Sequence, residues 1–223
     1  MQTMENELRA VLFDLDGVVF DTEPQYSVFW GSVCREFRPD FPGLENVIKG
    51  QTLVQIFDGY FHGMEAEQRE IVRRLDAYEG QMSYDYVPGF LTFIRALRVQ
   101  HIKTAVVTSS NQEKMAAVYR AHPDFRGLFD AVLTSEDFEE SKPSPDCFLK
   151  AAARLGVASE ECVVCEDSFN GLKAGQAARM AVLGLSTTNS ADSISPLCDR
   201  VVPDFIHVNV DNCRRLLLVP RHL

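Results

Sequence analysis

Residues 10–23 read Ala-Val-Leu-Phe-Asp-Leu-Asp-Gly-Val-Val-Phe-Asp-Thr-Glu, and the interpretation of the whole chain starts from them. The first four residues are typical of a buried strand, which stops at Asp14 and Asp16 with Gly17 just behind. Two like charges at the end of a hydrophobic strand are unfavourable unless a cation lies between them. A divalent cation that prefers oxygen ligands is the expected compensation, although an ordinary polar turn remains an alternative for this stretch alone.

Composition and charge are those of an ordinary globular protein. The 223 residues are 46% hydrophobic and 24% charged, which is enough for one substantial core with a small inserted domain. The net charge of −10 argues against nucleic acid or an anionic membrane as the main partner, and it favours a monomer or a weak dimer. Residues 1–9 do not resemble a signal peptide and no apolar run reaches membrane-spanning length, so we expect a cytoplasmic protein.

The sequence pattern changes near residue 87. Residues 22–86 show helical periodicity interrupted by proline and glycine, with no convincing strand. After residue 87, apolar runs alternate with amphipathic segments. The runs expected to form strands are residues 103–108, 131–135, 162–165, 180–185 and 200–202. Strands that are apolar throughout, each followed by a helix, predict an α/β fold with a doubly wound, Rossmann-like parallel sheet.

The predicted domain boundary falls directly after the opening stretch. Residues 1–21 and 87–223 are expected to form the α/β core, and residues 22–86 an inserted helical domain. Thr22 is expected to cap the first helix of the insert, and Thr52 is expected to cap a later one, because threonine is a favoured residue at helix N-termini.

Four of the predicted strands are followed by polar side chains. Parallel sheets of this kind bind ligands beyond the carboxyl ends of their strands, where these side chains would meet. In chain order, the candidate residues are Asp14, Asp16, Thr108, Ser109, Lys142, Glu166 and Asp167. Each segment alone has an ordinary alternative, such as a capped helix start or a solvated surface lysine. The combination is far more specific than any one part.

Together these groups indicate phosphoryl transfer. Mg²⁺ accepts a partial shell of hard oxygen ligands, so the expected metal-binding residues are Asp14, Asp16, Glu166 and Asp167. Thr108, the N–H groups that follow it from Ser109 onward, and Lys142 supply donors and positive charge for a phosphoryl group. Asp14 is then the expected nucleophile, because the metal and Lys142 screen its repulsion from the incoming anion. Asp16 is placed to protonate the leaving oxygen and later to deprotonate water.

Four segments resemble, in order, the four motifs of the haloacid dehalogenase superfamily, most closely those of the β-phosphoglucomutase and phosphoglycolate-phosphatase-like branch. They are residues 14–23, 106–110, 141–146 and 166–171. The resemblance covers nearly the whole chain. It implies that Asp14 is the nucleophile, Asp16 the acid and base, and residues 22–86 a cap that closes over the site. It also implies that Mg²⁺ binds Asp14, the backbone carbonyl of Asp16, and Asp167; whether Glu166 contacts the metal directly differs among relatives.

The same resemblance separates reaction classes. Dehalogenases of this superfamily lack an acid two residues after the nucleophile, so Asp16 favours phosphoryl transfer. Mutases of this branch carry a histidine and an arginine at two positions that are Tyr26 and Leu53 here, which counts against a mutase. The expected substrate-facing residues of the cap are Lys49, Gln51 and Thr52, although an ordinary structural break between two helices remains an alternative for this segment.

We therefore expect a Mg²⁺-dependent phosphatase that acts on a small phosphorylated metabolite through an aspartyl phosphate, with no nucleic-acid or membrane partner. The first alternative is a β-phosphoglucomutase-like sugar-phosphate mutase, which returns the phosphoryl group to a different hydroxyl. The second is a non-catalytic binding protein that keeps the fold as a sensor. Which phosphate ester is used stays open, because substrate choice depends on the geometry of the cap.

Overall fold

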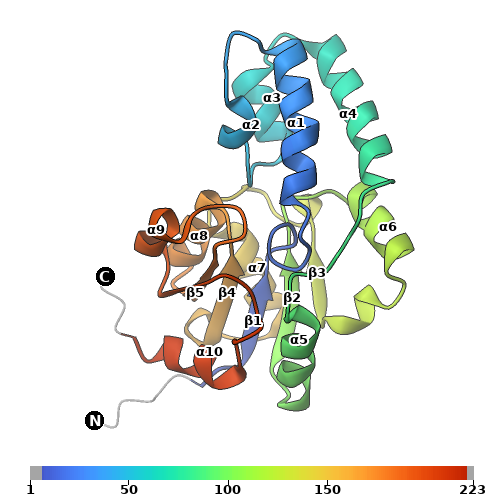
Figure 1. Ribbon diagram of the computed structural model, residues 1–223. Helices are drawn as coiled ribbons and strands as arrows, with labels where there is room; N and C mark the ends of the chain where they lie inside the picture. Colours follow the sequence, from blue (N-terminus) through green and yellow to red (C-terminus); the bar gives the residue numbers. More distant parts are fainter. Residues whose placement is uncertain (1–6, 220–223) are drawn as a thin grey trace.

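The computed structural model describes residues 7–219 and contains a parallel sheet covered by helices on both faces (Figure 1). Residues 1–6 and 220–223 lie outside the described residues. They include part of the segment 1–9 that was compared with a signal peptide, and both ends of the predicted core domain. Within residues 7–219, no helix combines the length and apolar character needed to cross a membrane.

The sheet has six strands in the order β3-β2-β1-β4-β5-β6, and each neighbouring pair is parallel. The strands are β1 (Ala10–Phe13), β2 (Lys103–Val107), β3 (Ala131–Leu133), β4 (Cys162–Glu166), β5 (Ala181–Leu185) and β6 (Arg200–Val202). The chain builds outward from β1 through β2 to β3 and then returns to the other side of β1 with β4. The predicted doubly wound α/β fold is confirmed, and each strand lies within two residues of its predicted position.

Helices cover both faces of this sheet, which explains why its strands are apolar throughout. The α-helices of the core are α5 (Phe90–Val99), α6 (Gln112–Ala121), α7 (Asp146–Leu155), α8 (Phe169–Ala177), α9 (Ala191–Ile194) and α10 (Val210–Leu217). The short 3₁₀ helices are η1 (Phe125–Leu128), η2 (Ser135–Asp137), η3 (Ser159–Glu161) and η4 (Ser195–Leu197). Alternate residues of β1 face opposite sides: Val11 and Phe13 pack with α5, α6 and α10, whereas Ala10 and Leu12 pack with α7 and α8.

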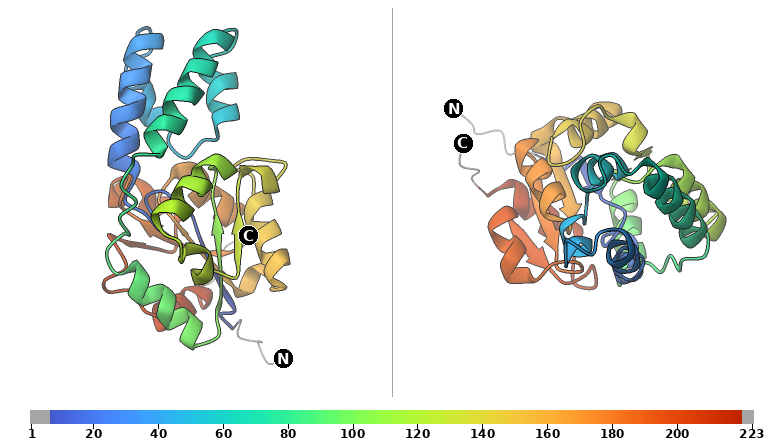
Figure 2. Two further views of the ribbon diagram at one scale, coloured as in Figure 1. Left: turned by 90° about the vertical axis from the view of Figure 1, so that its right-hand side faces the viewer. Right: turned by 90° about the horizontal axis from the view of Figure 1, so that it is seen from above.

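The remaining helices form a separate unit beyond the carboxyl edge of the sheet (Figures 1 and 2). They are α1 (Glu23–Phe37), α2 (Leu44–Val47), α3 (Leu53–Tyr60) and α4 (Glu65–Glu79). Their apolar faces make a hydrophobic cluster of their own, which includes Phe29, Trp30, Ile56 and Ile71. We propose that this helical unit is the cap predicted for residues 22–86.

The central position of β1 places the acidic stretch where several strands end. β1 lies between β2 and β4, so its carboxyl end meets theirs. The Asp14 backbone N–H donates to the Cys165 carbonyl oxygen at 3.0 Å, which continues the β1–β4 pairing by one residue. Behind it, the Phe13 ring makes an edge contact with Phe90, with ring centroids 5.5 Å apart. Apolar packing on one side therefore fixes the backbone that carries Asp14.

Candidate active site

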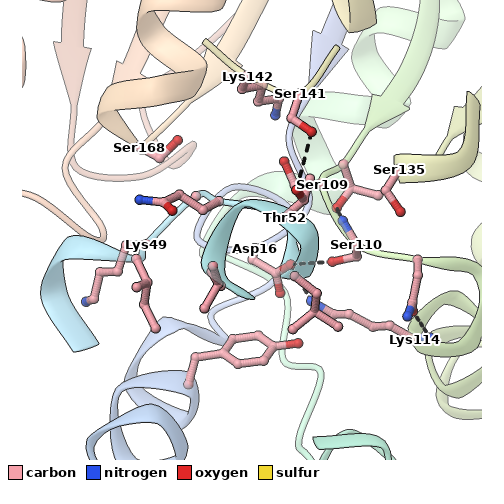
Figure 3. A pocket seen from close by; sticks show the side chains of 18 of the residues that line it. Asp16, Lys49, Thr52, Ser109, Ser110, Lys114, Ser135, Ser141, Lys142 and Ser168 are labelled. Carbon is pink, nitrogen blue, oxygen red and sulfur yellow. Dashed lines mark hydrogen bonds and ion pairs between the residues drawn. The ribbon is translucent and has the colours of Figure 1, made fainter. Parts of the chain in front are cut away.

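A cavity of about 660 Å³ lies between the carboxyl edge of the sheet and the helical unit. This volume suits a small organic ligand. Most of the residues predicted for the site line it: Asp14, Asp16, Lys49, Gln51, Thr52, Thr108, Ser109, Lys142 and Asp167. The structure thus brings together side chains that are up to 153 positions apart in the sequence, from Asp14 to Asp167. Figure 3 shows part of this lining, with Lys142 and Ser109 on the core side and Thr52 and Lys49 on the helical unit.

Asp14 lies at the floor of the cavity and is 9% exposed. Its Oδ1 accepts a hydrogen bond from Lys142 Nζ at 2.6 Å, and its Oδ2 accepts one from the Asp16 backbone N–H at 3.1 Å. The pKa of Asp14 is raised to about 7, chiefly by burial; Lys142 opposes this shift, and the carboxylates of Glu166 and Asp16 contribute to it. The Asp14 carboxylate therefore lies in a cluster with more negative than positive charge.

Lys142 is a fixed cation and not a solvated surface lysine, since it is only 1% exposed. Its ammonium group donates to Asp14 Oδ1 at 2.6 Å, Glu166 Oε1 at 2.7 Å and the Val107 carbonyl oxygen at 3.1 Å. These three acceptors use all three of its protons. Burial alone lowers the pKa of Lys142, but Asp14 and Glu166 outweigh burial and raise it. The positive charge is therefore permanent and held beside Asp14.

Glu166 lies beneath the cavity and is fully buried. Its Oε1 accepts from Lys142, and its Oε2 accepts from the backbone N–H groups of Asp167 and Ser168, both at 2.9 Å, and from the Ser168 hydroxyl at 3.0 Å. Both carboxylate oxygens are thus engaged by donors of the chain. Of the two roles left open by the sequence, this geometry favours Glu166 as the group that positions Lys142 and the Asp167 loop.

Asp16 lines the cavity and is held by three side chains. Its Oδ1 accepts from the Thr22 hydroxyl at 2.5 Å. Its Oδ2 accepts from the Lys114 ammonium group and from the Ser110 hydroxyl at 3.2 Å, the latter drawn in Figure 3. Thr22 occupies the N-cap position of α1 as expected, but its side chain makes no capping hydrogen bond to that helix. The Thr22 hydroxyl bonds to Asp16 instead.

Sequence reasoning missed Lys114. This residue is 2% exposed, and its ammonium group contacts Asp16 and lies 4.5 Å from the centroid of the Tyr26 ring. One sequence signal was available, because Lys114 stands in the first turn of α6, where the helix dipole disfavours a cation. A lysine in that position therefore indicates a nearby anion, here Asp16.

The helical unit contributes a buried acid, Glu79, that sequence reasoning also missed. The Tyr26 hydroxyl on α1 donates to Glu79 Oε1 on α4 at 2.6 Å, and Glu79 is only 6% exposed. Burial raises the pKa of Glu79, while Lys114 and the hydrogen bond from Tyr26 oppose that shift. Near the start of α1, Lys49 forms an ion pair with Glu23 at 3.6 Å.

The helical unit also touches the loop that carries Lys142. Thr52 caps α3 as expected, and its hydroxyl lies 3.3 Å from the Ser141 hydroxyl. The Gln55 amide donates to the Lys142 carbonyl oxygen at 2.9 Å. The first turn of α3 is therefore in direct contact with the loop that carries Lys142.

Asp167 and Asp14 fit the requirements of a magnesium site. Burial raises the pKa of Asp167 well above its usual value, and the charges of Glu166, Glu23 and Asp14 add to this. A side chain on Gly17, which has φ of +75°, would collide with the Asp167 carboxylate, so glycine permits the close approach of these two segments. Among residues 7–219, no three His, Cys, Asp or Glu side chains form a metal cage. Two carboxylates and a carbonyl are sufficient for Mg²⁺, which usually keeps several waters.

The family model for haloacid dehalogenase-like hydrolases matches residues 8–179. The chain belongs to this family. The chain is 34% identical over 194 residues to Protein SUPPRESSOR OF QUENCHING 1 of Arabidopsis thaliana. The aligned region covers 82% of the chain but only 18% of that protein. The chain spans 58% of the bifunctional riboflavin kinase/FMN phosphatase of the same plant. It is 28% identical to the fructose-1-phosphate phosphatase YqaB of Escherichia coli, over 79% of the chain and 96% of that enzyme.

The similar proteins include enzymes named as mutases as well as enzymes named as phosphatases. The chain is 29% identical to the β-phosphoglucomutase of Bacillus subtilis, over 80% of the chain and 83% of that protein. A haloacid dehalogenase hydrolase of family IA from Entamoeba histolytica superposes with a TM-score of 0.81 at 19% identity, over 95% of the chain and all of that structure. These matches confirm the predicted superfamily and its fold. The phosphatase names among the relatives support the expectation of a phosphatase enzyme.

Proposed function

We propose that this haloacid dehalogenase-like hydrolase is a Mg²⁺-dependent phosphatase that cleaves a small phosphate monoester through an aspartyl phosphate on Asp14. The position of Asp14 carries the proposal. Its carboxylate ends the central strand, lies 2.6 Å from the buried Lys142 ammonium group, and opens onto a cavity that also contains Asp16 and Thr108. Relatives named as phosphatases of sugar and polyol phosphates support a small phosphorylated substrate.

In the first step, an oxygen of Asp14 attacks the phosphorus atom while the bond to the ester oxygen breaks. Asp16 gives its proton to the departing alcohol oxygen. Lys142 and the donors at Thr108 and Ser109 neutralise the charge on the phosphoryl oxygens. In the second step, Asp16 takes a proton from water, the water oxygen attacks phosphorus, and Asp14 is released with inorganic phosphate.

The residues that would hold Mg²⁺ are Asp14, Asp167 and the backbone carbonyl of Asp16. When bound, the metal supplies positive charge that neutralises and orients the phosphoryl group. Glu166 acts indirectly in this proposal, through its hydrogen bonds to Lys142 and to the loop of Asp167. The helical unit excludes bulk water when it closes, with Lys49, Gln51 and Thr52 facing the substrate.

Hydrolysis is favoured over the mutase alternative by the residues on the cap side. The mutase reaction needs a second site for an anion, because its intermediate carries two phosphoryl groups. Tyr26 and Leu53, at the positions where mutases of this branch carry histidine and arginine, both line the cavity and neither supplies positive charge. Conversion of β-glucose 1-phosphate to glucose 6-phosphate with little free phosphate would reverse the choice.

The decisive experiment is the Asp14→Asn variant. It should abolish hydrolysis of p-nitrophenyl phosphate with Mg²⁺, while circular dichroism and the melting temperature show a folded protein. Asp21→Asn is the matched control, since Asp21 belongs to the same motif but is exposed and does not line the cavity. Near-normal turnover by Asp14→Asn would rule out the proposed mechanism.

A further inference from the structure

The cations that line the cavity are all paired with acidic side chains of the chain itself. Among the described lining residues the only basic side chains are Lys49, Lys114 and Lys142. Lys49 pairs with Glu23 at 3.6 Å, Lys114 pairs with Asp16, and Lys142 pairs with both Asp14 and Glu166. A substrate phosphoryl group at Asp14 would use the charge of Lys142. A second anionic group on the substrate would meet no unpaired cation in the described lining.

The cavity lining carries further negative charge. Glu45, Glu79, Glu136 and Glu139 line the cavity besides the acids of the four motifs. Glu79 is the most enclosed of these, since it is 6% exposed and stands on α4 facing the core. Its hydrogen-bond donor is the neutral Tyr26 hydroxyl, and the Lys114 charge that also acts on it is paired with Asp16. A phosphate or carboxylate brought near Glu79 would be repelled in a partly dry environment, where charge interactions are strong.

The cavity lining also offers apolar surface and one buried hydrogen-bond acceptor without a donor. Trp30, Ile56 and Leu75 line the cavity on the helical unit. The Glu23 Oε2 atom is buried and has no hydrogen-bond donor, although Lys49 lies at ion-pair distance. A buried acceptor of this kind is unfavourable unless a ligand supplies a donor. Substrate hydroxyl groups would satisfy it, and the C–H faces between them would pack on the apolar side chains.

We propose that the enzyme selects monophosphates whose alcohol part is uncharged and carries several hydroxyl groups, and that Glu79 is the residue that rejects a second anionic group. The inference rests on the proposed phosphatase function. It assigns specificity to a repulsive element as well as to attractive contacts, which is a common way to discriminate between ligands that share one recognised group.

Matched substrate pairs test the selection. The first pair is fructose 1-phosphate and fructose 1,6-bisphosphate, and the second is glycerol 1-phosphate and 3-phosphoglycerate, in which a carboxylate replaces the hydroxymethyl group. In both pairs we expect kcat/KM to be about tenfold or more higher for the member that lacks the second anionic group. Each compound is also measured as a competitive inhibitor of p-nitrophenyl phosphate hydrolysis, so that a poor substrate still reports its binding. Equal or better use of the anionic members would overturn the inference and leave the phosphatase function intact.

The role of Glu79 is tested with Glu79→Gln, which removes the charge and keeps an acceptor for the Tyr26 hydroxyl. The preference ratio within each pair should narrow by about tenfold, through a higher kcat/KM for the anionic member. Glu65→Gln is the matched control on the same helix, because Glu65 is exposed and does not line the cavity, and its ratios should equal those of the wild type.

An unchanged ratio in Glu79→Gln would overturn the role of Glu79. If that variant does not fold, the substrate pairs on the wild-type enzyme still decide the selection. Failure of the wild type to hydrolyse any of these esters or p-nitrophenyl phosphate with Mg²⁺ is a different result, which would remove the proposed function and this inference with it.

Discussion

Two clusters of ion pairs in this protein have similar geometry and opposite surroundings. In the core, Lys142 contacts Asp14 and Glu166 at 2.6 and 2.7 Å, and the Lys142 and Glu166 side chains are at most 1% exposed. In the helical unit, Arg74 contacts Glu36 and Glu70, both at 2.7 Å, but these side chains are 34–48% exposed. Distances alone would rank the clusters as equals. Burial separates them.

Solvent decides what each cluster can do. In the exposed cluster, hydrogen bonds from Arg73 and Arg74 lower the pKa of Glu70 to about 2, yet water and salt screen such pairs so well that they add little to stability. In the buried cluster, removing either the Lys142 cation or its carboxylate partners would leave the remaining charge unpaired in a site that water does not reach. A fixed charge of that kind is what phosphoryl transfer needs, since it acts without reorganisation of solvent.

The strongest test of this difference is to replace the central cation of each cluster by methionine, beginning with Lys142→Met. The variant leaves Asp14 and Glu166 buried without a cation, so the free energy of unfolding should fall by about 3–5 kcal/mol in urea denaturation. Turnover of p-nitrophenyl phosphate should fall by about 10³-fold or more, because the charge that neutralises the phosphoryl group is lost. Activity within tenfold of the wild type would mean that the buried charge is not needed.

The position of Lys142 could be predicted from the sequence because it follows from strand topology. Apolar runs such as residues 10–13 and 162–165 identify strands, and parallel strands end at one edge, so polar groups behind them must meet. The same logic placed Asp14, Thr108 and Asp167 at one cavity. These predictions needed no knowledge of how helices pack.

The residues that were missed depend on helix packing. Glu79 reaches the cavity because α4 packs beside α1 and α6, which no local pattern specifies. Threonine is a residue type that often caps helices, but in the folded protein the Thr22 hydroxyl donates to Asp16, six residues earlier in the chain. Specificity on the cap side is therefore harder to predict than chemistry on the core side.

A second experiment varies the pH to test whether the core cluster carries an excess of negative charge. The pKa of Asp14 is raised by burial to about 7 from its ordinary 3.8, and that of Asp167 is raised too. In metal-free protein, the stability that comes from protonated Asp14 is fully present below pH 3.8 and is lost as pH rises through about 7. Mg²⁺ requires the ionised carboxylates, so its apparent affinity should rise by about tenfold per pH unit for each proton released.

The measurement is the increase in melting temperature on adding Mg²⁺. This increase should be small near about pH 5.5 and clearly larger near about pH 8. Asp167→Asn is the control, and it should lose most of the increase at the higher pH. An increase that does not change with pH in the wild type would contradict the assignment of Asp14 and Asp167 to the metal.

A smaller effect is expected at Lys114, which is buried like Lys142 but pairs with only one carboxylate, that of Asp16. Lys114→Met leaves Asp16 with its hydrogen bonds from Thr22 and Ser110, so the proposed proton-transfer group stays in the site but is less well held. We expect kcat for p-nitrophenyl phosphate to fall by about tenfold with little change in KM. Lys173→Met, at an exposed lysine on α8, is the control and should match the wild type.

The smallest effect is expected for Arg74→Met, the counterpart of the first substitution. Arg74 also lies over the Phe37 ring, with its guanidinium carbon 5.3 Å from the ring centroid, and methionine keeps part of that apolar contact. The melting temperature should fall by about 2 °C or less, and this loss should shrink further in high salt because the pairs are solvent-exposed. Turnover should not change, since Arg74 does not line the cavity. A loss of stability as large as that of Lys142→Met would show that the exposed cluster holds the helical unit together, and burial would then be the wrong criterion for ranking these ion pairs.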